Sequence, residues 1–447
     1  MNSASTPPTR QPQLSSVEDR RAHAALSRDE LHARQLARLN HLLVDVFPHN
    51  PFYAERVSRV MQSRGLQPLS QVDELAEFPF TLKSELQQPG RFEELGVVSA
   101  ANHTYALQQY SRFHQTSGTT GRPLVVMDTA ADWRQWIDSW QYVLDAAELT
   151  PADRVFLAFS FGPFIGFWSA FDAATARGCL AIPGGALSSE ARLRMILDTR
   201  STVLCCTPSY ALHLAEVASA QQLNLAASNV RVIIVAGEPG GSLPATREKI
   251  ESAWGAWVLD HAGASEVGAW GYGTKDGSGL YINERDFIAE YISPGSGTPV
   301  APDETAELVL TNLHRPGLPV LRYRTGDLVR APQLTDSGFA FLQGGVLGRV
   351  DDMLIVRGVN IYPTAIEQIL REFAEIVEFR ITAFRKAEMD ELEIEIETTN
   401  RDDQIVGAAA EELRLRLGLR VSVNLVPPDT LPRFELKGRR FVDKRGN

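Results

Sequence analysis

Short apolar runs alternate with stretches of helical spacing through the middle of the chain. The predicted strands are 154–161, 202–207, 231–236 and 257–261. The predicted helices are 165–177, 209–219 and 243–254. This repetition indicates an α/β fold with a largely parallel sheet and helices on both faces. Ligands of such sheets bind beyond the carboxyl ends of the strands, which is where Thr207, Gly237 and Ala262-Gly263 fall.

The N-terminal region and the third quarter of the chain follow other patterns. Residues 1–20 are rich in Pro, Ser, Thr and Gln, which predicts disorder. Leucines from Leu31 to Leu43 recur at helical spacing and predict an amphipathic helix after it. Short strands and turns over about 270–345 predict a small β subdomain. We therefore expect a large N-terminal domain over 21–347.

The last hundred residues predict a separate α+β domain over 348–447. Its predicted strands are 353–356, 391–397 and 420–425, and its predicted helices are 364–373 and 404–417. The boundary at 348–352 is polar and contains Gly348, as a hinge between domains requires.

Composition limits the class of protein. With 447 residues the chain is too long for one hydrophobic core, so we expect two or more domains. Hydrophobic content of 44% and charged content of 22% are typical of a soluble globular protein, and no apolar run is long enough to span a membrane. A net charge of −11 argues against a nucleic-acid partner. Three cysteines in apolar surroundings and no visible secretory signal predict reduced thiols in a cytoplasmic protein.

Candidate chemistry centres on residues 115–123, which read Gln-Thr-Ser-Gly-Thr-Thr-Gly-Arg-Pro. The two glycines permit positive φ angles that turn backbone N–H groups toward an anion, the three central hydroxyls add donors, and Arg122 adds charge. The segment is not a Walker A loop, because Arg122-Pro123 and a predicted strand follow its second glycine. It predicts either a loop that holds nucleotide phosphates or an ordinary turn between strands.

This segment resembles the phosphate loop of the adenylate-forming superfamily, which includes acyl-CoA synthetases, adenylation domains and luciferases. More narrowly, the chain is similar to the phenylacetate–CoA ligase branch, where the loop typically reads Ser-Ser-Gly-Thr-Thr-Gly-Lys-Pro. Further matching motifs occur in the expected order over about residues 30–445. They are 79–83 (PFTLK), 207–212 (TPSYAL), 237–239 (GEP), 263–266 (GASE), 322–327 (RYRTGD), 348–353 (GRVDDM), 357–363 (RGVNIYP) and 437–440 (KGRR).

The resemblance implies a nucleotide site built from these motifs. Glu266 would bind Mg²⁺, Asp327 would accept the ribose hydroxyls, and Arg349 would contact the nucleotide. Lys437 would bring a positive charge to the reacting carboxylate and α-phosphate. The other implied nucleotide-binding residues are Ser117, Gly118, Thr119, Thr120, Gly121, Arg122, Gly237, Glu238, Pro239, Ala262, Gly263 and Ser265.

Ordinary interpretations of the charged residues stay open. Glu266 could be a solvated loop carboxylate, Asp327 a turn-forming residue, and Lys437 part of a solvated basic tail. Two positions also depart from the family pattern. Arg122 stands where the family usually has Lys, and Leu436 stands where a Gly usually precedes the catalytic Lys.

Aromatic residues at 159–168 predict a pocket for an aromatic acid. They contain Gly and Pro after a predicted strand, which favours a loop, although aromatics at this density are often core. By resemblance, Phe159 and Phe164 match aryl-binding positions, and the other implied substrate-binding residues are Tyr210, His261 and Gly263. The resemblance also implies a CoA site at Arg357, Gly358 and Val359, and a domain rotation about Asp351.

The implied function is that of an aryl-CoA ligase that uses ATP, Mg²⁺ and CoA. An aromatic acid of the benzoate, anthranilate or phenylacetate type would react with ATP to give acyl-AMP and pyrophosphate, and the CoA thiol would then form the thioester. One alternative is an adenylating enzyme that delivers the acyl group to a carrier-protein pantetheine or to an amine. A second is a non-catalytic nucleotide-binding homologue, against which Glu266, Asp327, Arg349 and Lys437 all weigh. The branch also implies a homodimer.

Overall fold

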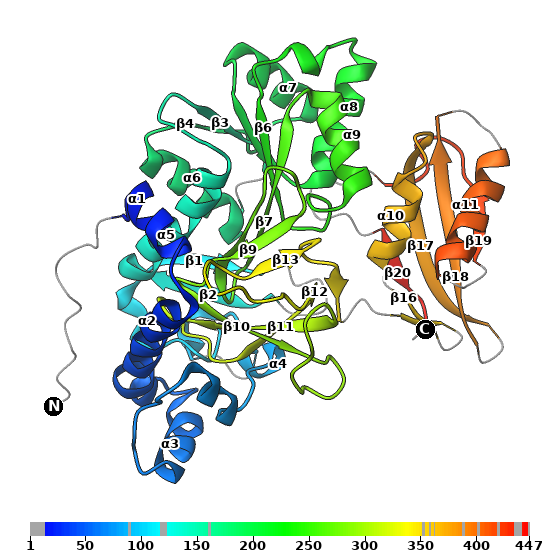
Figure 1. Cartoon of the computed structure of the whole chain (residues 1–447). Coiled ribbons are helices and arrows are strands. Elements are labelled where there is room, and N and C mark those ends of the chain that lie inside the picture. The colour runs from blue at the N-terminus through cyan, green and yellow to red at the C-terminus, as the bar shows by residue number, and fades with distance from the viewer. Residues whose placement is uncertain are drawn as a thin grey trace.

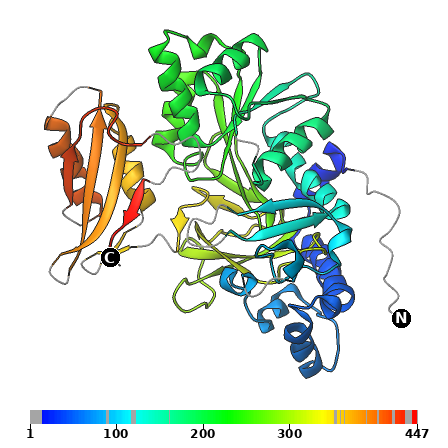
Figure 2. The ribbon, with the colours of Figure 1, turned by 180° about the vertical axis from the view of Figure 1, so that it is seen from behind.

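A computed structural model describes most of the chain as a large domain with a smaller domain to one side (Figure 1). The described residues are 14–87, 91–116, 123–159, 162–350, 354–356, 359–361, 363–386, 389–399, 403–417, 421–432 and 440–445. In both views the small domain lies beside helices α8 (Pro208–Ala220) and α9 (Pro244–Trp254) (Figures 1 and 2).

An eight-stranded sheet forms the centre of the large domain. Its strand order is β13-β9-β8-β7-β6-β5-β3-β4, parallel from β4 to β7 and antiparallel from β7 to β13. The strands are β3 (Arg154–Leu157), β4 (Leu180–Pro183), β5 (Val203–Cys206), β6 (Val232–Ala236), β7 (Trp257–Ala264), β8 (Gly268–Gly273), β9 (Gly279–Ile282) and β13 (Phe341–Gln343). The four predicted strands and their parallel pairing are confirmed, with bounds that differ by a few residues.

Helices cover both faces of this sheet, as the alternating pattern predicts. On one face α5 (Ala130–Ala146) and α6 (Ile165–Arg177) pack against alternate residues of the parallel strands, which are odd-numbered in β3, β5 and β7 and even-numbered in β6. On the other face α7 (Ser189–Asp198), α8 and α9 pack against the residues between them. Helix α6 has the predicted bounds because Gly178 follows it with φ +88°, a left-handed conformation that ends a helix at low cost.

The strand-rich segment 270–345 contains a separate β unit as predicted, but only part of the segment belongs to it. Strands β8, β9 and β13 extend the central sheet. A separate sheet has the order β10-β11-β12-β14 and is built from β10 (Phe287–Ile292), β11 (Thr305–Asn312), β12 (Tyr323–Arg330) and β14 (Gly348–Arg349). Turn spacing alone does not show which sheet a strand joins, because this depends on the neighbouring strand with which it pairs and not only on its own residues. A third sheet pairs β1 (Tyr110–Gln115) with β2 (Val125–Thr129).

The N-terminal segment is ordered from an earlier residue than predicted. Helix α1 (Val17–Ala24) begins with a capping box between Ser16 and Asp19, so the expectation of disorder is wrong for residues 17–20. Arg20 is buried and donates to both carboxylate oxygens of Asp145 on α5, an anchor that composition does not reveal.

The predicted amphipathic helix is α2 (Arg28–His41). The large domain also contains several other short helices. They are a π-helical turn η1 (Leu42–Val46), then η2 (Phe47–His49), α3 (Ala54–Ser63), η3 (Val72–Glu77), α4 (Lys83–Leu86), η4 (Glu93–Leu95), η5 (Leu107–Gln109) and η6 (Leu225–Ala227).

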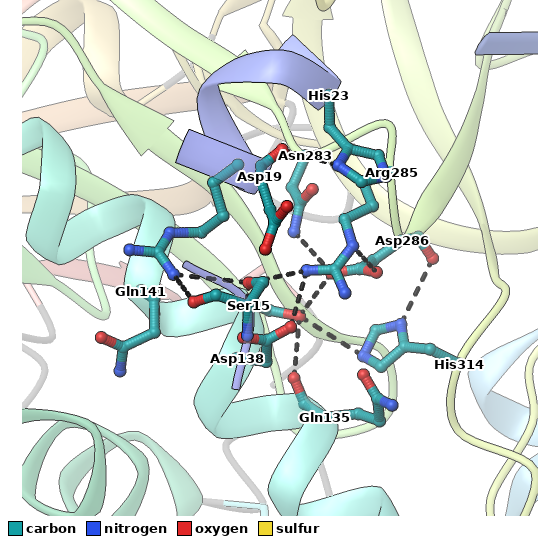
Figure 3. Close-up of polar contacts among 12 residues, drawn as sticks. Ser15, Asp19, His23, Gln135, Asp138, Gln141, Asn283, Arg285, Asp286 and His314 are labelled. Carbon is teal, nitrogen blue, oxygen red and sulfur yellow. Dashed lines mark hydrogen bonds and ion pairs between the residues drawn. The ribbon is translucent and has the colours of Figure 1, made fainter. Parts of the chain in front are cut away.

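A polar cluster joins this N-terminal region to α5 and to the turn before β10 (Figure 3). Arg285 lies at its centre and donates to Asp138 at 2.6 Å and to Ser15 at 3.2 Å. Asp286 accepts from Ser139 and Asn283, so segments far apart in sequence share one network.

The small domain has the predicted α+β composition. Its main sheet has the order β19-β18-β17-β20, and α10 and α11 pack with it around one core. The elements are β15 (Leu354–Val356), β16 (Val359–Ile361), α10 (Pro363–Arg371), β17 (Ile376–Lys386), β18 (Met389–Thr398), α11 (Asp403–Leu417), β19 (Ser422–Leu425) and β20 (Phe441–Asp443).

Candidate active site

Three parallel strands end side by side at the candidate site. Residue 206 pairs with 235 across β5 and β6, and Ala236 pairs with His261 across β6 and β7. The loops that follow are linked, because the Glu238 carboxylate accepts the Ser209 backbone N–H at 2.8 Å. Gly237 has φ +94°, a backbone conformation that favours glycine. The predicted convergence at these strand ends is therefore present.

Glu266 lies just beyond β7 and is almost completely buried. Its Oε1 lies 2.9 Å from Lys83 Nζ in an ion pair without hydrogen-bond geometry, so this buried oxygen accepts no hydrogen bond from the described residues. A buried carboxylate oxygen of this kind fits Mg²⁺, which takes few protein ligands and completes its shell with water and phosphate oxygens. Within the described ranges no cluster of three or more His, Cys, Asp or Glu could hold a metal alone.

Lys83 reaches Glu266 because motif 79–83 joins motif 322–327. Thr81 and Tyr323 form a parallel bridge, and Arg324 N–H donates to Thr81 O at 3.0 Å. Lys83 then begins the short helix α4. Two motifs separated by more than two hundred residues thus place a cation beside Glu266.

Arg315 supports the backbone next to Glu266. Its Nη1 donates to Ser265 O at 2.8 Å, while Nε and Nη2 donate to the two oxygens of Asp128 at 2.6 and 3.0 Å. Both partners are essentially inaccessible to solvent, and the guanidinium carbon lies 4.8 Å from the Trp136 ring centroid. A bidentate buried pair of this kind holds its members in one orientation.

Asp327 and Arg349 are neighbours across β12 and β14. They are directly paired in the antiparallel ladder, and Arg349 Nη1 donates to Asp327 Oδ1 at 2.9 Å. The Arg349 side chain is 41% exposed and that of Asp327 is 16% exposed, so both groups can reach a ligand at the surface of the site. The two implied nucleotide contacts therefore lie together.

Aromatic side chains gather on the α5–α6 face of the sheet. Phe159 stacks on Phe167 at 4.1 Å between ring centroids, and Phe164 meets Phe167 edge-on at 6.0 Å. Trp140 of α5 lies 4.3 Å from the His261 ring. We call Trp140, Phe159, Phe164, Phe167 and His261 the aromatic cluster.

Tyr210, another residue expected to bind the substrate, does not join the aromatic cluster. It packs in the core on the opposite face of the sheet, and its hydroxyl lies 3.0 Å from Ser189 Oγ. The side chain is 1% exposed. Helix α8 follows β5 and packs across that face of the sheet.

Several implied site residues lie outside the described residues. These are Ser117, Gly118, Thr119, Thr120, Gly121, Arg122, Asp351, Arg357, Gly358 and Lys437. The flanks of the phosphate segment are described: β1 ends at Gln115, whose N–H donates to Pro163 O at 2.7 Å, and β2 begins at Val125. The predicted phosphate loop thus starts beside the aromatic loop. Val359 begins β16 and pairs with Val356.

Sequence reasoning gave no individual role to Lys83, Arg315, Asp128 or Trp140. Lys83 lies within the matched motif 79–83, so that motif was the feature of the sequence that could have identified it. Arg315 and Asp128 are isolated charges in apolar surroundings, and such charges are seldom buried unless paired. Trp140 is one of three tryptophans spaced along α5, and such spacing is equally typical of residues that pack in the hydrophobic core.

Comparisons with known proteins show the family of the chain. The AMP-binding enzyme family matches residues 54–309, and the AMP-binding enzyme C-terminal domain matches residues 358–445. The chain is 31% identical over 435 residues to phenylacetate-coenzyme A ligase of Escherichia coli (strain K12), covering 93% of this chain and 95% of the relative. The chain belongs to the AMP-binding enzyme family, and it is an enzyme of the acid–thiol ligase class.

One solved protein superposes differently in two of its states. For 2-hydroxyisobutyryl-CoA ligase in the postadenylation state in complex with 2-HIB-AMP, the TM-score is 0.88 at 26% identity, covering 98% of this chain and 95% of that chain. For the same ligase in complex with 2-HIB-AMP and CoA in the thioesterification state, the TM-score is 0.69 at 27% identity, with the same coverage. No helix in the described part of this chain is long and apolar enough to cross a membrane.

Proposed function

We propose that this protein is an ATP-dependent aryl-CoA ligase. The observation that carries the proposal is the position of the aromatic cluster, which reaches β7 at His261, a few residues before Glu266 on the same chain segment. An aromatic acid held there would present its carboxylate toward the nucleotide residues. An aromatic-walled slot favours a flat benzenoid acid over an aliphatic one.

The first half-reaction joins the acid to AMP. A carboxylate oxygen attacks the α-phosphorus of ATP, the bond to the β-phosphate oxygen breaks, and pyrophosphate leaves. Asp327 and Arg349 would orient the ribose and phosphates, the loop at 117–122 would hold the phosphates, and Lys437 would neutralise charge at the reacting centre. Mg²⁺, held by Glu266, would supply Lewis-acid stabilisation of the phosphates when bound.

The second half-reaction transfers the acyl group to a thiol. The CoA sulfur attacks the acyl carbon, AMP leaves, and the thiol proton passes to solvent. Arg357, Gly358 and Val359 would border the CoA path after a rotation near Asp351. The higher TM-score with the postadenylation state supports the proposal that the small domain lies here in an adenylation-like arrangement. In that arrangement Arg440 donates to Glu378, which anchors the chain three residues after Lys437.

The test measures the two half-reactions separately. Pyrophosphate exchange with benzoate-, anthranilate- and phenylacetate-type acids reports adenylation, and thioester formation with free CoA reports transfer. Both should occur with at least one aromatic acid. Lys437→Ala should reduce adenylation by about 10²- to 10⁴-fold and spare thioester formation from supplied acyl-AMP. Exchange without thioester would favour a carrier protein or an amine as acceptor, and no exchange with any aromatic acid would refute the proposal.

A further inference from the structure

His261 has the position of a residue that contacts the acid. It lies on β7 with its side chain on the same face as Phe159. Its ring is 4.3 Å from that of Trp140, and the residue is 7% exposed. The surroundings of the imidazole are therefore aromatic and apolar.

The two ring nitrogens of His261 have different roles. Nδ1 lies 2.7 Å from Gly271 O, and because a carbonyl oxygen only accepts, Nδ1 carries the proton. Burial lowers the pKa of His261 to about 4, so the ring is neutral at pH 7. Nε2 is consequently a hydrogen-bond acceptor.

Nε2 has no donor among the described residues. The hydrogen bond that this side chain makes with a described residue uses Nδ1 alone. Gly263 keeps the space beside Nε2 open, because a Cβ at that position would lie 3.5 Å from Nε2 and 3.0 Å from Gly268 O. Nε2 is not among the buried polar atoms that lack a partner, and a ligand that brings a donor to this acceptor would gain a hydrogen bond.

We propose that His261 Nε2 is a specificity-determining acceptor that selects aromatic acids bearing a ring hydroxyl or amino group. This inference rests on the proposed aryl-CoA ligase function. The donor on the ring would satisfy Nε2, while Trp140 and Phe159 contact the ring itself. An acid that offers a methoxy group or hydrogen instead would leave Nε2 without a partner and bind less well.

The test compares matched acids with matched variants. Pyrophosphate exchange gives kcat/KM for benzoate and for the ortho, meta and para isomers of hydroxy-, amino- and methoxybenzoate, with the same substitutions on phenylacetate. His261→Phe removes the acceptor at similar size, and His261→Gln restores a polar group. His103→Gln is the control, since His103 is also a buried neutral histidine but both of its nitrogens are bonded within the protein. The ¹⁵N chemical shift of Nε2 on adding acid without ATP gives a readout independent of turnover.

Wild type should prefer one hydroxy or amino isomer over its methoxy counterpart by about 10- to 100-fold. His261→Phe should abolish that preference, because kcat/KM should fall more for the preferred isomer than for the unsubstituted acid. His261→Gln should keep part of the preference, and His103→Gln should keep all of it. The Nε2 shift should move only with the preferred acid. Equal use of all isomers by wild type, or a preference that survives in His261→Phe, would overturn the inference while leaving the ligase function intact. Failure of every aromatic acid in exchange would instead refute the proposed function.

Discussion

Arg315 connects the buried strand β2 to the residue expected to hold magnesium. Its guanidinium binds Asp128 with two hydrogen bonds and Ser265 O with a third, so the backbone next to Glu266 depends on a charge that never meets solvent. Removing one partner of a buried pair leaves the other charge uncompensated, whereas removing both is far less costly.

Arg315→Met should lower the free energy of unfolding by about 3–5 kcal/mol, because Asp128 stays buried without its partner. The double variant Arg315→Met, Asp128→Asn should recover most of that loss. Adenylation by the double variant should still be about 10- to 100-fold slower, since nothing then holds Ser265 O. Urea unfolding and pyrophosphate exchange measure the two effects. Full exchange activity in the double variant would show that Arg315 has only a structural role.

At the scale of elements, His103 holds strand β2 and makes its stability depend on pH. Nδ1 lies 2.6 Å from Ala100 O, and Met127 N–H donates to Nε2 at 3.1 Å, so only the neutral ring satisfies both contacts. Burial lowers the pKa of His103 to about 4, against about 6.5 in an unfolded chain. The unfolded state therefore binds more protons between these pH values, and this contribution to stability rises with pH through that window.

The free energy of unfolding should fall between pH 7 and pH 5, and it should fall by about 1–2 kcal/mol less in His103→Gln than in the wild type. The reason is that the glutamine amide can donate and accept hydrogen bonds without titrating. Urea titrations of both proteins at the two pH values measure it. Burial also lowers the pKa of His114 to about 4 and raises that of Asp132 to about 6, with opposite effects. The difference between variant and wild type isolates His103, and an identical loss in both proteins would contradict this prediction.

Helix α1 and the polar cluster beneath it should differ in their contribution to stability. Asp145 keeps Arg177 at 2.6 Å when Arg20 is removed, so Arg20→Met should cost about 1–3 kcal/mol. Asp138 would keep only Ser15 when Arg285 is removed, so Arg285→Met should cost about 3–5 kcal/mol (Figure 3). Urea midpoints rank the two variants. The reverse order would mean that α1, and not the cluster, secures the N-terminal region.

At the scale of the whole molecule, a polar seam joins the two domains. Lys249 Nζ of α9 donates to Phe373 O just after α10, at 3.0 Å. Near the start of α10, Thr364 donates to Leu347 O at 2.6 Å. A narrow crevice beside this seam has Glu216 of α8 on one wall, and Arg371, Glu378 and Arg440 on the other.

Lys249→Met should weaken the docked arrangement by the loss of one hydrogen bond, which corresponds to about 2- to 10-fold. Adenylation should slow by that factor, and thioester formation from supplied acyl-AMP should not slow. X-ray scattering should show a broader distribution of domain separations. Lys275→Met is the matched control, because Lys275 is paired with Glu148 on the surface of the large domain. Equal effects of the two substitutions would refute a role for the seam.

Much of the fold could be predicted because local patterns agree with it. Helix α6 has the predicted bounds since apolar spacing and a terminal glycine both specify it. The parallel strands were recognisable because strands buried on both faces are continuous apolar runs. The prediction for 270–345 had only part of the bounds right, since strands of similar composition joined two different sheets. The prediction for 17–20 was wrong because Arg20 is held by a distant carboxylate.

By itself, the sequence determined the family, the order of the motifs, the parallel core and the charged residues Glu266, Asp327 and Arg349, because each is encoded by neighbouring residues. Only the tertiary structure decided that Lys83 meets Glu266, that Arg315 and Asp128 form a buried pair, and that Tyr210 belongs to the opposite face. It also decided which nitrogen of His261 is the acceptor, through Gly271 O on the adjacent strand. These contacts join residues distant in sequence, and their geometry follows from strand register and helix packing, which no local pattern specifies.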